Sequence, residues 1–189
     1  FDKGLARLQE VQGLATHRGP DAPSAETDCL AHSALSCTDA STFLANPVMA
    51  EEVFGPATIV VQCRDAGEML QVAQNVGGQL TATVHGTEDD FQSHGALLAA
   101  LTDVAGRVVF NGLPTGVEVC PSMHHGGPYP ASTDARTTSV GTASIQRFAR
   151  PVCYQEMPES LLPDALKESN PAGILRMVDG SWTREGGGA

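Results

Sequence analysis

The chain has 189 residues, 41% of them hydrophobic, which is enough to bury one substantial core. Its 22 Asp and Glu against 11 Lys and Arg give a net charge of −11, which argues against nucleic acid or an anionic membrane as a partner, because both require basic surface. We expect neither a signal peptide nor a membrane span, which needs roughly 20 apolar residues. Five cysteines without a CxxC pair indicate reduced thiols and a cytoplasmic location.

The first part of the chain predicts short elements separated by turns. Apolar residues at helical spacing predict a helix over residues 1–12. Two glycines and two prolines predict an exposed loop over 13–26, and the loose alternation over 29–37 predicts a strand. Thr38 or Asp39 is expected to cap a short helix that ends at the following Asn-Pro pair.

From Pro56 onward, apolar runs and helical patterns alternate. The predicted elements are a buried strand over 58–63, a helix from Asp65 to Gly77, a strand over 80–85, a helix from Asp89 or Asp90 to Gly106, and a strand over 107–110. Asp65 and Glu68 form a capping-box pattern. Strands alternating with helices over short links predict an α/β fold with a parallel sheet and right-handed crossovers.

A long loop over 112–122 follows the last of these strands, and long ordered loops are often functional. The residues that could line a pocket there are Val117, Val119, Cys120, Met123, His124 and His125. The cysteine and the two histidines could instead be an ordinary buried thiol and loop surface. Structural zinc requires four ligands with paired spacing, and no second pair is evident, so no metal site is expected.

Two acids and an aromatic residue precede the strand over 58–63, in the order Glu51-Glu52-Val53-Phe54-Gly55-Pro56. A carboxylate at the mouth of a strand can accept two hydrogen bonds from ribose hydroxyls, and a ring beside it can pack on a flat heterocycle. The ordinary alternatives are a pair of solvated acids and a core aromatic residue.

Three stretches resemble the aldehyde dehydrogenase superfamily. They are EEVFGP at 51–56, RVVFNG at 107–112 with its following loop, and HGGPYP at 125–130 leading into SVGT at 139–142. The sequence over 123–154 is most similar to the branch of this family that oxidises 2-oxoglutarate semialdehyde (2,5-dioxopentanoate). In this family a cysteine thiolate attacks the aldehyde, hydride passes to NAD or NADP, and a glutamate-activated water releases the acid.

The resemblance implies roles for individual residues. Glu52 and Phe54 would hold the nicotinamide ribose of NADP or NAD, with the ribose contact on the second acid rather than on Glu51. The loop after Asn111 would form the wall of the tunnel for a small-molecule aldehyde. Its implied lining residues are Val119, Cys120, His124 and His125. A dicarboxylic-type semialdehyde would also require a cation at the tunnel mouth, for which the candidates are Arg107 and Arg136.

The resemblance also implies a domain organisation. Residues 1–143 would be the carboxy-terminal portion of the catalytic domain, and 144–189 an oligomerisation strand and tail in a homodimer or homotetramer. Because the chain begins at Phe1 within a helical pattern, we expect the cofactor-binding domain, the nucleophile and the general base to lie upstream. Cys29 and Cys37 lie too near the acidic pair to be the nucleophile. No catalytic residue, and no activity of the chain alone, is expected.

Two other classes of function remain open. The chain could be a non-catalytic assembly module, or an enzyme of another family that shares only these local sequences. The strand-like run over 144–157 contains Arg150-Pro151, which is typical of an edge strand, whether it pairs within the chain or with a partner. Beyond it, we expect a short helix over 161–167, a short strand or helical turn over 174–178, and disorder over 186–189.

Overall fold

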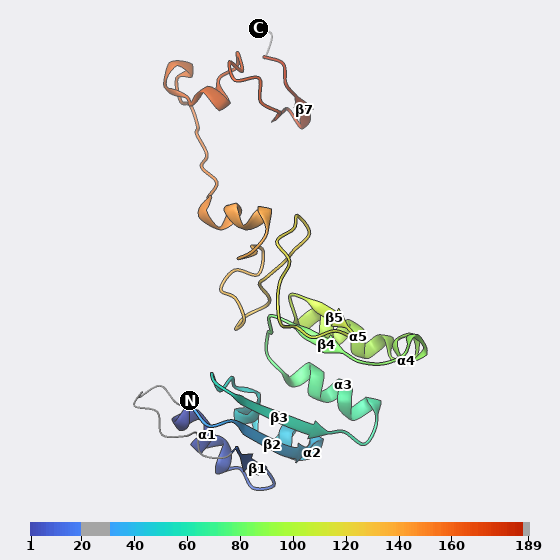
Figure 1. The fold of residues 1–189 in the computed structure, drawn as a ribbon. Coiled ribbons are helices and arrows are strands. Elements are labelled where there is room, and N and C mark those ends of the chain that lie inside the picture. Colours follow the sequence, from blue (N-terminus) through green and yellow to red (C-terminus); the bar gives the residue numbers. More distant parts are fainter. Residues whose placement is uncertain (20–30, 187–189) are drawn as a thin grey trace. The chain divides into compact units, whose positions relative to one another are not determined.

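The computed structural model describes residues 1–19 and 31–186. It divides into two units, Phe1–Ala149 and Arg150–Ala189, each with its own internal contacts (Figure 1). Both combine short helices with short strands, which confirms the mixed α/β class in its general form. The functional division expected between residues 143 and 144 stays a prediction. All residues expected to bind cofactor or substrate lie in the first unit.

A three-stranded mixed sheet begins the first unit, with its strands in the order β1–β2–β3. β1 (Ala15–Arg18) runs antiparallel to β2 (Ala34–Asp39), and β2 runs parallel to β3 (Ala57–Gln62). The register of the parallel pair places Asp39 opposite Gln62, so β2 and β3 end together.

The strand expected over 58–63 is therefore confirmed, and the one expected over 29–37 is confirmed from residue 34 onward; residues 29 and 30 lie outside the described part of the chain. The expectation of a loop over 13–26 is wrong at β1, because these residues complete their backbone hydrogen bonds against β2. The remainder of that loop, residues 20–26, also lies outside the described residues.

Four helical elements accompany this sheet. They are α1 (Asp2–Gln9), α2 (Ala40–Ala45), the 3-10 helix η1 (Pro47–Ala50) and α3 (Ala66–Asn75). Leu8, Phe43 and Met49 form a buried cluster against which Ile59 and Val72 pack. The core thus joins α1, α2, η1, β3 and α3 in one apolar layer.

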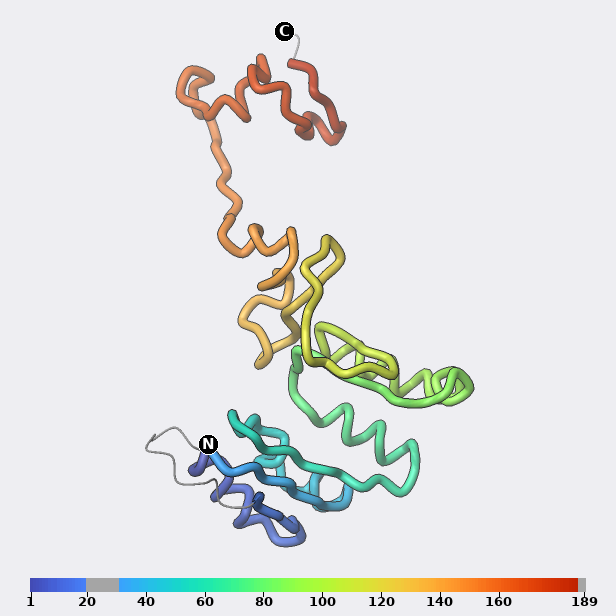
Figure 2. The backbone as a smooth tube through the Cα atoms, in the orientation of Figure 1, coloured from blue at the N-terminus to red at the C-terminus, as the bar shows by residue number. Residues whose placement is uncertain are grey.

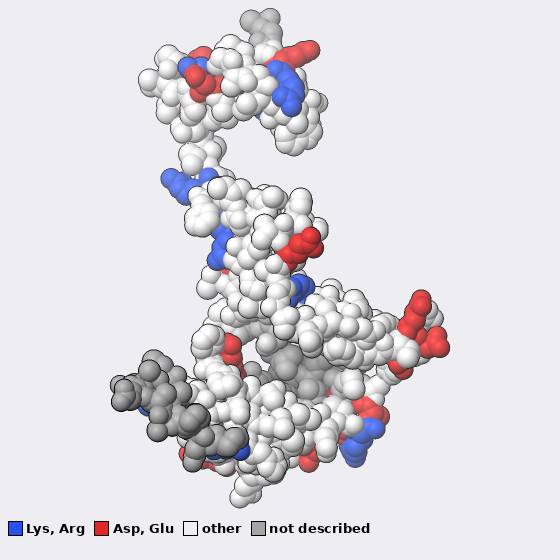
Figure 3. Space-filling view, viewed as in Figure 1, with Lys and Arg blue, Asp and Glu red and all other residues white. Residues whose placement is uncertain are grey.

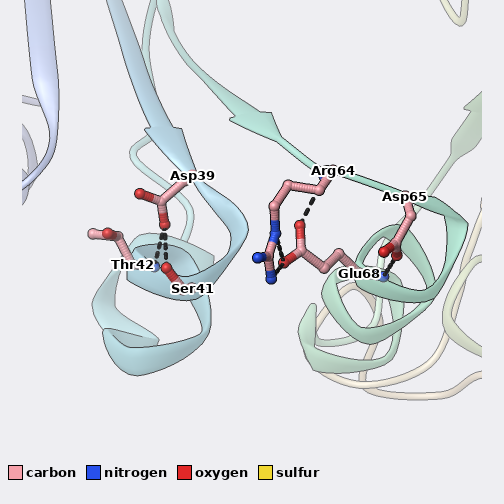
Figure 4. Close-up of polar contacts among 6 residues, drawn as sticks. All are labelled: Asp39, Ser41, Thr42, Arg64, Asp65 and Glu68. Atoms are coloured by element: carbon pink, nitrogen blue, oxygen red, sulfur yellow. Dashed lines mark hydrogen bonds and ion pairs between the residues drawn. The ribbon is translucent and has the colours of Figure 1, made fainter.

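Aspartates begin the two helices that follow the parallel strands (Figure 4). The Asp39 carboxylate accepts a hydrogen bond from the amide of Thr42 at 2.7 Å, and that of Asp65 accepts one from the amide of Glu68 at 2.9 Å. Both caps confirm the sequence expectation. Glu68 does not complete the capping box, because its carboxylate bonds the amide and guanidinium of Arg64 instead.

A second β-α-β arrangement follows α3. It consists of β4 (Ala82–Val84), α4 (Glu88–Ser93), α5 (Gly95–Val104) and β5 (Val108–Phe110). β4 and β5 are parallel, as expected, and α5 packs against α3. The single helix expected from Asp89 or Asp90 is wrong, because α4 ends at the non-helical backbone of His94 and α5 begins after it. Figure 3 shows acidic side chains gathered at α4.

The expected continuous sheet across the three strands over 58–63, 80–85 and 107–110 is wrong. β3 pairs with β2, whereas β4 and β5 form a separate two-stranded sheet. The hydrophobic pattern identifies each strand because side chains alternate locally, but the choice of neighbour depends on contacts distant in sequence.

The strand expected over 144–157 is also wrong for the chain by itself. Residues 142–148 form the 3-10 helix η2 (Thr142–Phe148), and 149–158 have no regular structure. Every residue from Ile145 to Leu161 is exposed. Pro151 lacks an amide hydrogen, and none of the described strands pairs with the segment.

The second unit is small and built from turns. It contains two 3-10 turns, η3 (Glu159–Leu161) and η4 (Asp164–Leu166), in place of the short helix expected over 161–167, and a hairpin of β6 (Arg176–Val178) and β7 (Ser181–Thr183). The strand alternative over 174–178 is thus confirmed. Positive φ values of 49° at Asp179 and 80° at Gly180 form the hairpin turn. Of the tail expected to be disordered, residues 187–189 lie outside the described residues.

Candidate functional site

The hexapeptide over residues 51–56 lies immediately before β3. Pro56 joins it to the sheet, because its carbonyl accepts a hydrogen bond from the amide of Ala34 at 2.9 Å. Gly55 lets the ring of Phe1 approach closely, since a Cβ atom at this position would lie 2.2 Å from that ring. The backbone of the hexapeptide is thus held between β2 and the start of α1.

The two acids of the hexapeptide have different environments. Glu51 forms an exposed ion pair with Arg7, at 2.9 Å between Oε2 and Nη1. The exposed carboxylate of Glu52 has no hydrogen-bond or ion-pair partner among the described residues. The ring of Phe54 is 85% exposed. A carboxylate free of a cation retains its full capacity to accept hydrogen bonds from a ligand, which favours Glu52 over Glu51.

A cavity of about 690 Å³ lies beneath the hexapeptide and is here called the Phe54 cavity. Its lining combines the hexapeptide with apolar residues of β3 and α3. The lining includes Glu51, Glu52 and Phe54 from the hexapeptide, together with the apolar residues Ile59, Val72 and Val76. Apolar walls below an exposed ring and a free carboxylate suit a flat heterocycle that has hydroxyl groups attached.

A second cavity, of about 810 Å³, is here called the His125 cavity. It is formed by segments that precede β3, β4 and β5, together with part of the long loop. Its lining includes Glu51, Glu52, Gln79, Arg107, Pro114, Gly116, Val117 and His125. Glu51, Glu52 and Gln79 line both cavities. The structure therefore brings the acidic pair and the loop after β5 to one place, which the sequence alone could not do.

Close backbone crossings of glycines position His125 on this cavity. A Cβ atom on Gly106 would lie 2.0 Å from the carbonyl oxygen of Gly126, and one on Gly78 would lie 2.0 Å from that of Pro128. Both distances are too short for a side chain. The segment after His125 can therefore pass over the starts of β4 and β5 only because glycines stand at these crossings.

The other predicted lining residues lie farther along the loop. Val119 is 75% exposed, Cys120 Sγ lies 3.5 Å from the hydroxyl of Ser122, and His124 is half-buried. Neither these three predicted residues nor Phe54 line the His125 cavity. Gln79 and Gly116 were not anticipated, since a glutamine and a glycine in turns have no distinctive sequence signal.

The His125 cavity lies at the amino ends of the strands. Glu52 precedes β3, Thr81 precedes β4 and Arg107 precedes β5. Asn111 follows β5 at the opposite end, where its side-chain amide bonds the backbone of Gly86 at 2.8 and 2.9 Å. The loop must return from there to reach the cavity, and Figure 2 shows it as a long excursion of the backbone beyond β5. Nucleotide sites of open α/β sheets lie at carboxyl ends, so this placement differs from that rule.

None of the described cysteines lies on either cavity. Cys37 is in β2, half-buried, and Cys29 lies outside the described residues. Burial raises the pKa of the Cys63 thiol, and the neighbouring charges of Glu68 and Asp65 raise it further, so this thiol is protonated at neutral pH. Cys63 is thus not a reactive thiolate.

In the part of the chain that the structure describes, no group of three or more His, Cys, Asp or Glu side chains could hold a metal ion. Over the same residues, no helix is long and apolar enough to cross a membrane.

Two curated proteins are similar to the chain over almost its whole length. The alpha-ketoglutaric semialdehyde dehydrogenase 2 of Azospirillum brasilense is 47% identical over 180 residues, which is 95% of this chain and 34% of that protein. The alpha-ketoglutaric semialdehyde dehydrogenase of Acinetobacter baylyi is 45% identical over 185 residues, which is 97% of this chain and 35% of that protein. Over almost its whole length, the chain is thus similar to about a third of each of two dehydrogenases that act on alpha-ketoglutaric semialdehyde.

This similarity confirms the resemblance found in the sequence. No protein-family model matches the chain. The chain spans about a third of the length of the two dehydrogenases, so its residues account for only part of such a protein.

Proposed function

We propose that these residues form the carboxy-terminal part of an NADP- or NAD-dependent aldehyde dehydrogenase that oxidises 2-oxoglutarate semialdehyde to 2-oxoglutarate. One observation supports this most strongly: the unpaired carboxylate of Glu52 lies between two cavities, one lined by Phe54 and the other by the long loop and His125. The substrate is proposed from the names of two relatives that are 47% and 45% identical to the chain.

On the cofactor side, the residues present fit a nicotinamide riboside. Glu52 would accept hydrogen bonds from ribose hydroxyls, because its oxygens have no other partner among the described residues. The exposed ring of Phe54 would pack beside the heterocycle. When bound, the nicotinamide supplies the hydride acceptor. The contribution of this chain is to hold it in a fixed orientation toward the aldehyde.

On the substrate side, the His125 cavity would receive the aldehyde. Val117 and the exposed segment over 114–116 would form its wall, and His125 would contribute a polar edge. Val119, Cys120 and His124, farther along the loop, are proposed to extend this lining in the whole protein.

The chemical groups of the reaction are proposed to lie elsewhere in the whole protein. The nucleophilic cysteine and the general-base glutamate would come from the two-thirds of the relatives' length that this chain does not span. Residues 1–143 would serve as the carboxy-terminal portion of the catalytic domain and 144–189 as an oligomerisation strand and tail. We therefore expect no aldehyde-dependent NAD(P)H formation from the 189 residues alone.

Homo-oligomer formation is part of the same proposal. The segment from Ile145 to Leu161 is exposed throughout, and residues 149–158 within it have no regular structure, so their backbone groups remain available to pair with another subunit's sheet edge. In the described part of the chain, Cys37, Cys63, Cys120 and Cys153 are free thiols, which supports a reducing compartment such as the cytoplasm.

The decisive experiment is Glu52→Gln in the full-length protein, with Glu51→Gln as the matched control. A hydrogen bond to a charged group contributes about 1.5–3 kcal/mol, so Glu52→Gln is expected to weaken cofactor binding or slow hydride transfer by roughly 10- to 100-fold. Glu51→Gln removes only the exposed ion pair with Arg7 and is expected to change either quantity less than about threefold.

Isothermal titration with the cofactor and single-turnover hydride transfer would measure both effects. Wild-type values for Glu52→Gln, or equal losses in the two variants, would reject the cofactor role of Glu52.

A further inference from the structure

Arg107 connects the long loop to the strands around the His125 cavity. Its guanidinium donates from Nη1 to the carbonyl of Gly116 at 2.6 Å and from Nη2 to that of Pro114 at 3.4 Å. Its Nε donates to the hydroxyl of Thr81 at 3.3 Å. One planar group therefore joins two loop carbonyls to the residue that precedes β4, while Arg107 itself precedes β5.

The loop has few other polar contacts. Among the described residues, no backbone hydrogen bond joins 113–119 to the rest of the chain, and no other side chain bonds this segment. Leu113 is 76% exposed and Val119 is 75% exposed, so apolar burial does not hold these parts of the loop either. The fork of Arg107 is thus the main polar restraint on this wall of the cavity.

The same contacts show whether Arg107 or Arg136 serves as a free cation for a substrate or as a residue that holds the loop. A guanidinium has five N–H donors in a fixed plane, and three nitrogens of Arg107 already donate within the chain. Arg136 lies in another segment, where it pairs with Asp134 at 3.3 Å, and does not line the cavity. The planar arrangement of the Arg107 donors therefore holds the loop, in addition to the positive charge that the side chain provides.

We propose that Arg107 is a positioning residue that sets the conformation of the loop over 112–119 and thereby the size of aldehyde that the His125 cavity accepts. This rests on the proposed function, because it assigns the cavity to the aldehyde. Losing the fork releases the wall, so aldehydes long enough to touch it lose affinity, while the shortest aldehydes and the cofactor are unaffected.

The test compares Arg107→Lys and Arg107→Met in the full-length protein, with Arg136→Met as control. Lysine keeps the charge but cannot donate to two carbonyls and a hydroxyl from one plane, so both Arg107 variants are expected to raise KM for a long dicarboxylic-type semialdehyde roughly 10-fold. KM for acetaldehyde and for the cofactor is expected to change less than about twofold, and Arg136→Met to match the wild type.

A second measurement does not depend on activity. Glu118 lies in the loop, so limited digestion with a glutamate-specific protease, followed by mass spectrometry, reports the exposure of the bond after it. Cleavage there is expected to accelerate roughly 10-fold in both Arg107 variants and not in Arg136→Met.

The outcomes separate the two proposals. Wild-type kinetics for Arg107→Lys, equal losses for short and long aldehydes, or unchanged cleavage after Glu118 would each overturn the positioning role. If the Arg107 variants are cleaved faster but the full-length protein oxidises no aldehyde, Arg107 still restrains the loop in the wild type. That result would reject both the proposed function and the selection of aldehyde size. A cofactor defect in Glu52→Gln with no effect of Arg107→Met would keep the proposed function and reject the positioning role.

Discussion

The sheet layer at the start of the chain and the unit at its end are stabilised by different forces. In the first, α1, α2 and η1 bury Leu8, Phe43 and Met49 against β3 and α3. In the second, Asn170 is the only buried residue among those described. One region therefore depends on apolar burial, and the other on a buried amide.

The hydrogen bonds around Asn170 show how a small unit can form without an apolar core. Its amide nitrogen donates to the carbonyls of Ile174 at 3.0 Å and Arg184 at 2.7 Å, and its oxygen accepts from the amide of Ile174. Arg176 adds donations to the carbonyls of Lys167 and Glu168, at 2.5 and 2.6 Å. These bonds connect the turns to both ends of the β6–β7 hairpin, so side chains replace the missing strand neighbours.

The largest expected effect comes from emptying the apolar core. Phe43 is 6% exposed, so Phe43→Ala is expected to lower the free energy of unfolding by about 3–5 kcal/mol. Phe54→Ala is the matched control, because the ring of Phe54 is 85% exposed and its loss is expected to cost less than about 0.5 kcal/mol. Denaturant unfolding, with hydrogen exchange of the β2 amides as a local probe, measures both. Equal losses would mean that the sheet layer is not held by this core.

A smaller effect is expected from Asn170→Gly in the second unit. Its φ of 46° suits glycine, so the change removes the side-chain bonds without adding backbone strain. Losing such a hydrogen bond costs about 0.5–1.5 kcal/mol, and faster exchange of the β6 and β7 amides is expected to report it.

Asp179→Gly provides the control for that change. Asp179 has a similar φ of 49° but makes no side-chain hydrogen bond among the described residues, so its substitution is expected to leave the hairpin unchanged. If the two variants exchange alike, turn conformation and not the Asn170 amide stabilises this unit.

The contrast also explains which parts of the fold could be predicted from sequence. Asp39 and Asp65 were correctly expected to begin helices, because capping involves residues three apart. The start of α4 was placed too late, although Thr87 forms a capping box with Asp90 and was recognisable. The Asp179-Gly180 pair is likewise a hairpin signal that can be read from local sequence.

Features that depend on distant contacts could not be predicted. β3 pairs with β2, and the loop returns to Arg107, through hydrogen bonds to backbone groups. Every residue has a backbone carbonyl, so the sequence does not show which one will be the partner. For the site, the sequence indicated Glu52 over Glu51 only through family resemblance. The ion pair that occupies Glu51 involves Arg7, 44 residues earlier. Polar partners at such separations have no local pattern.

The smallest expected effect concerns acid pH and the helix caps of the first unit. Hydrogen bonds from the Ser41 hydroxyl and the Thr42 amide hold the pKa of Asp39 below its ordinary value of 3.8. Because the folded-state pKa is the lower one, the ionised cap stabilises the fold fully above pH 3.8, and this contribution is lost as the pH falls through the folded-state value.

Asp39→Asn tests that linkage because asparagine caps a helix nearly as well but does not titrate. Unfolding midpoints measured from pH 7 down to about pH 2 are expected to fall less steeply for Asp39→Asn than for the wild type. Ser41→Ala removes the first of the two bonds and is expected to move the acid limb of the wild-type curve to higher pH. Parallel curves for all three proteins would show that this exposed cap adds no pH-dependent stability, leaving the apolar core as the dominant stabilising feature of the first unit.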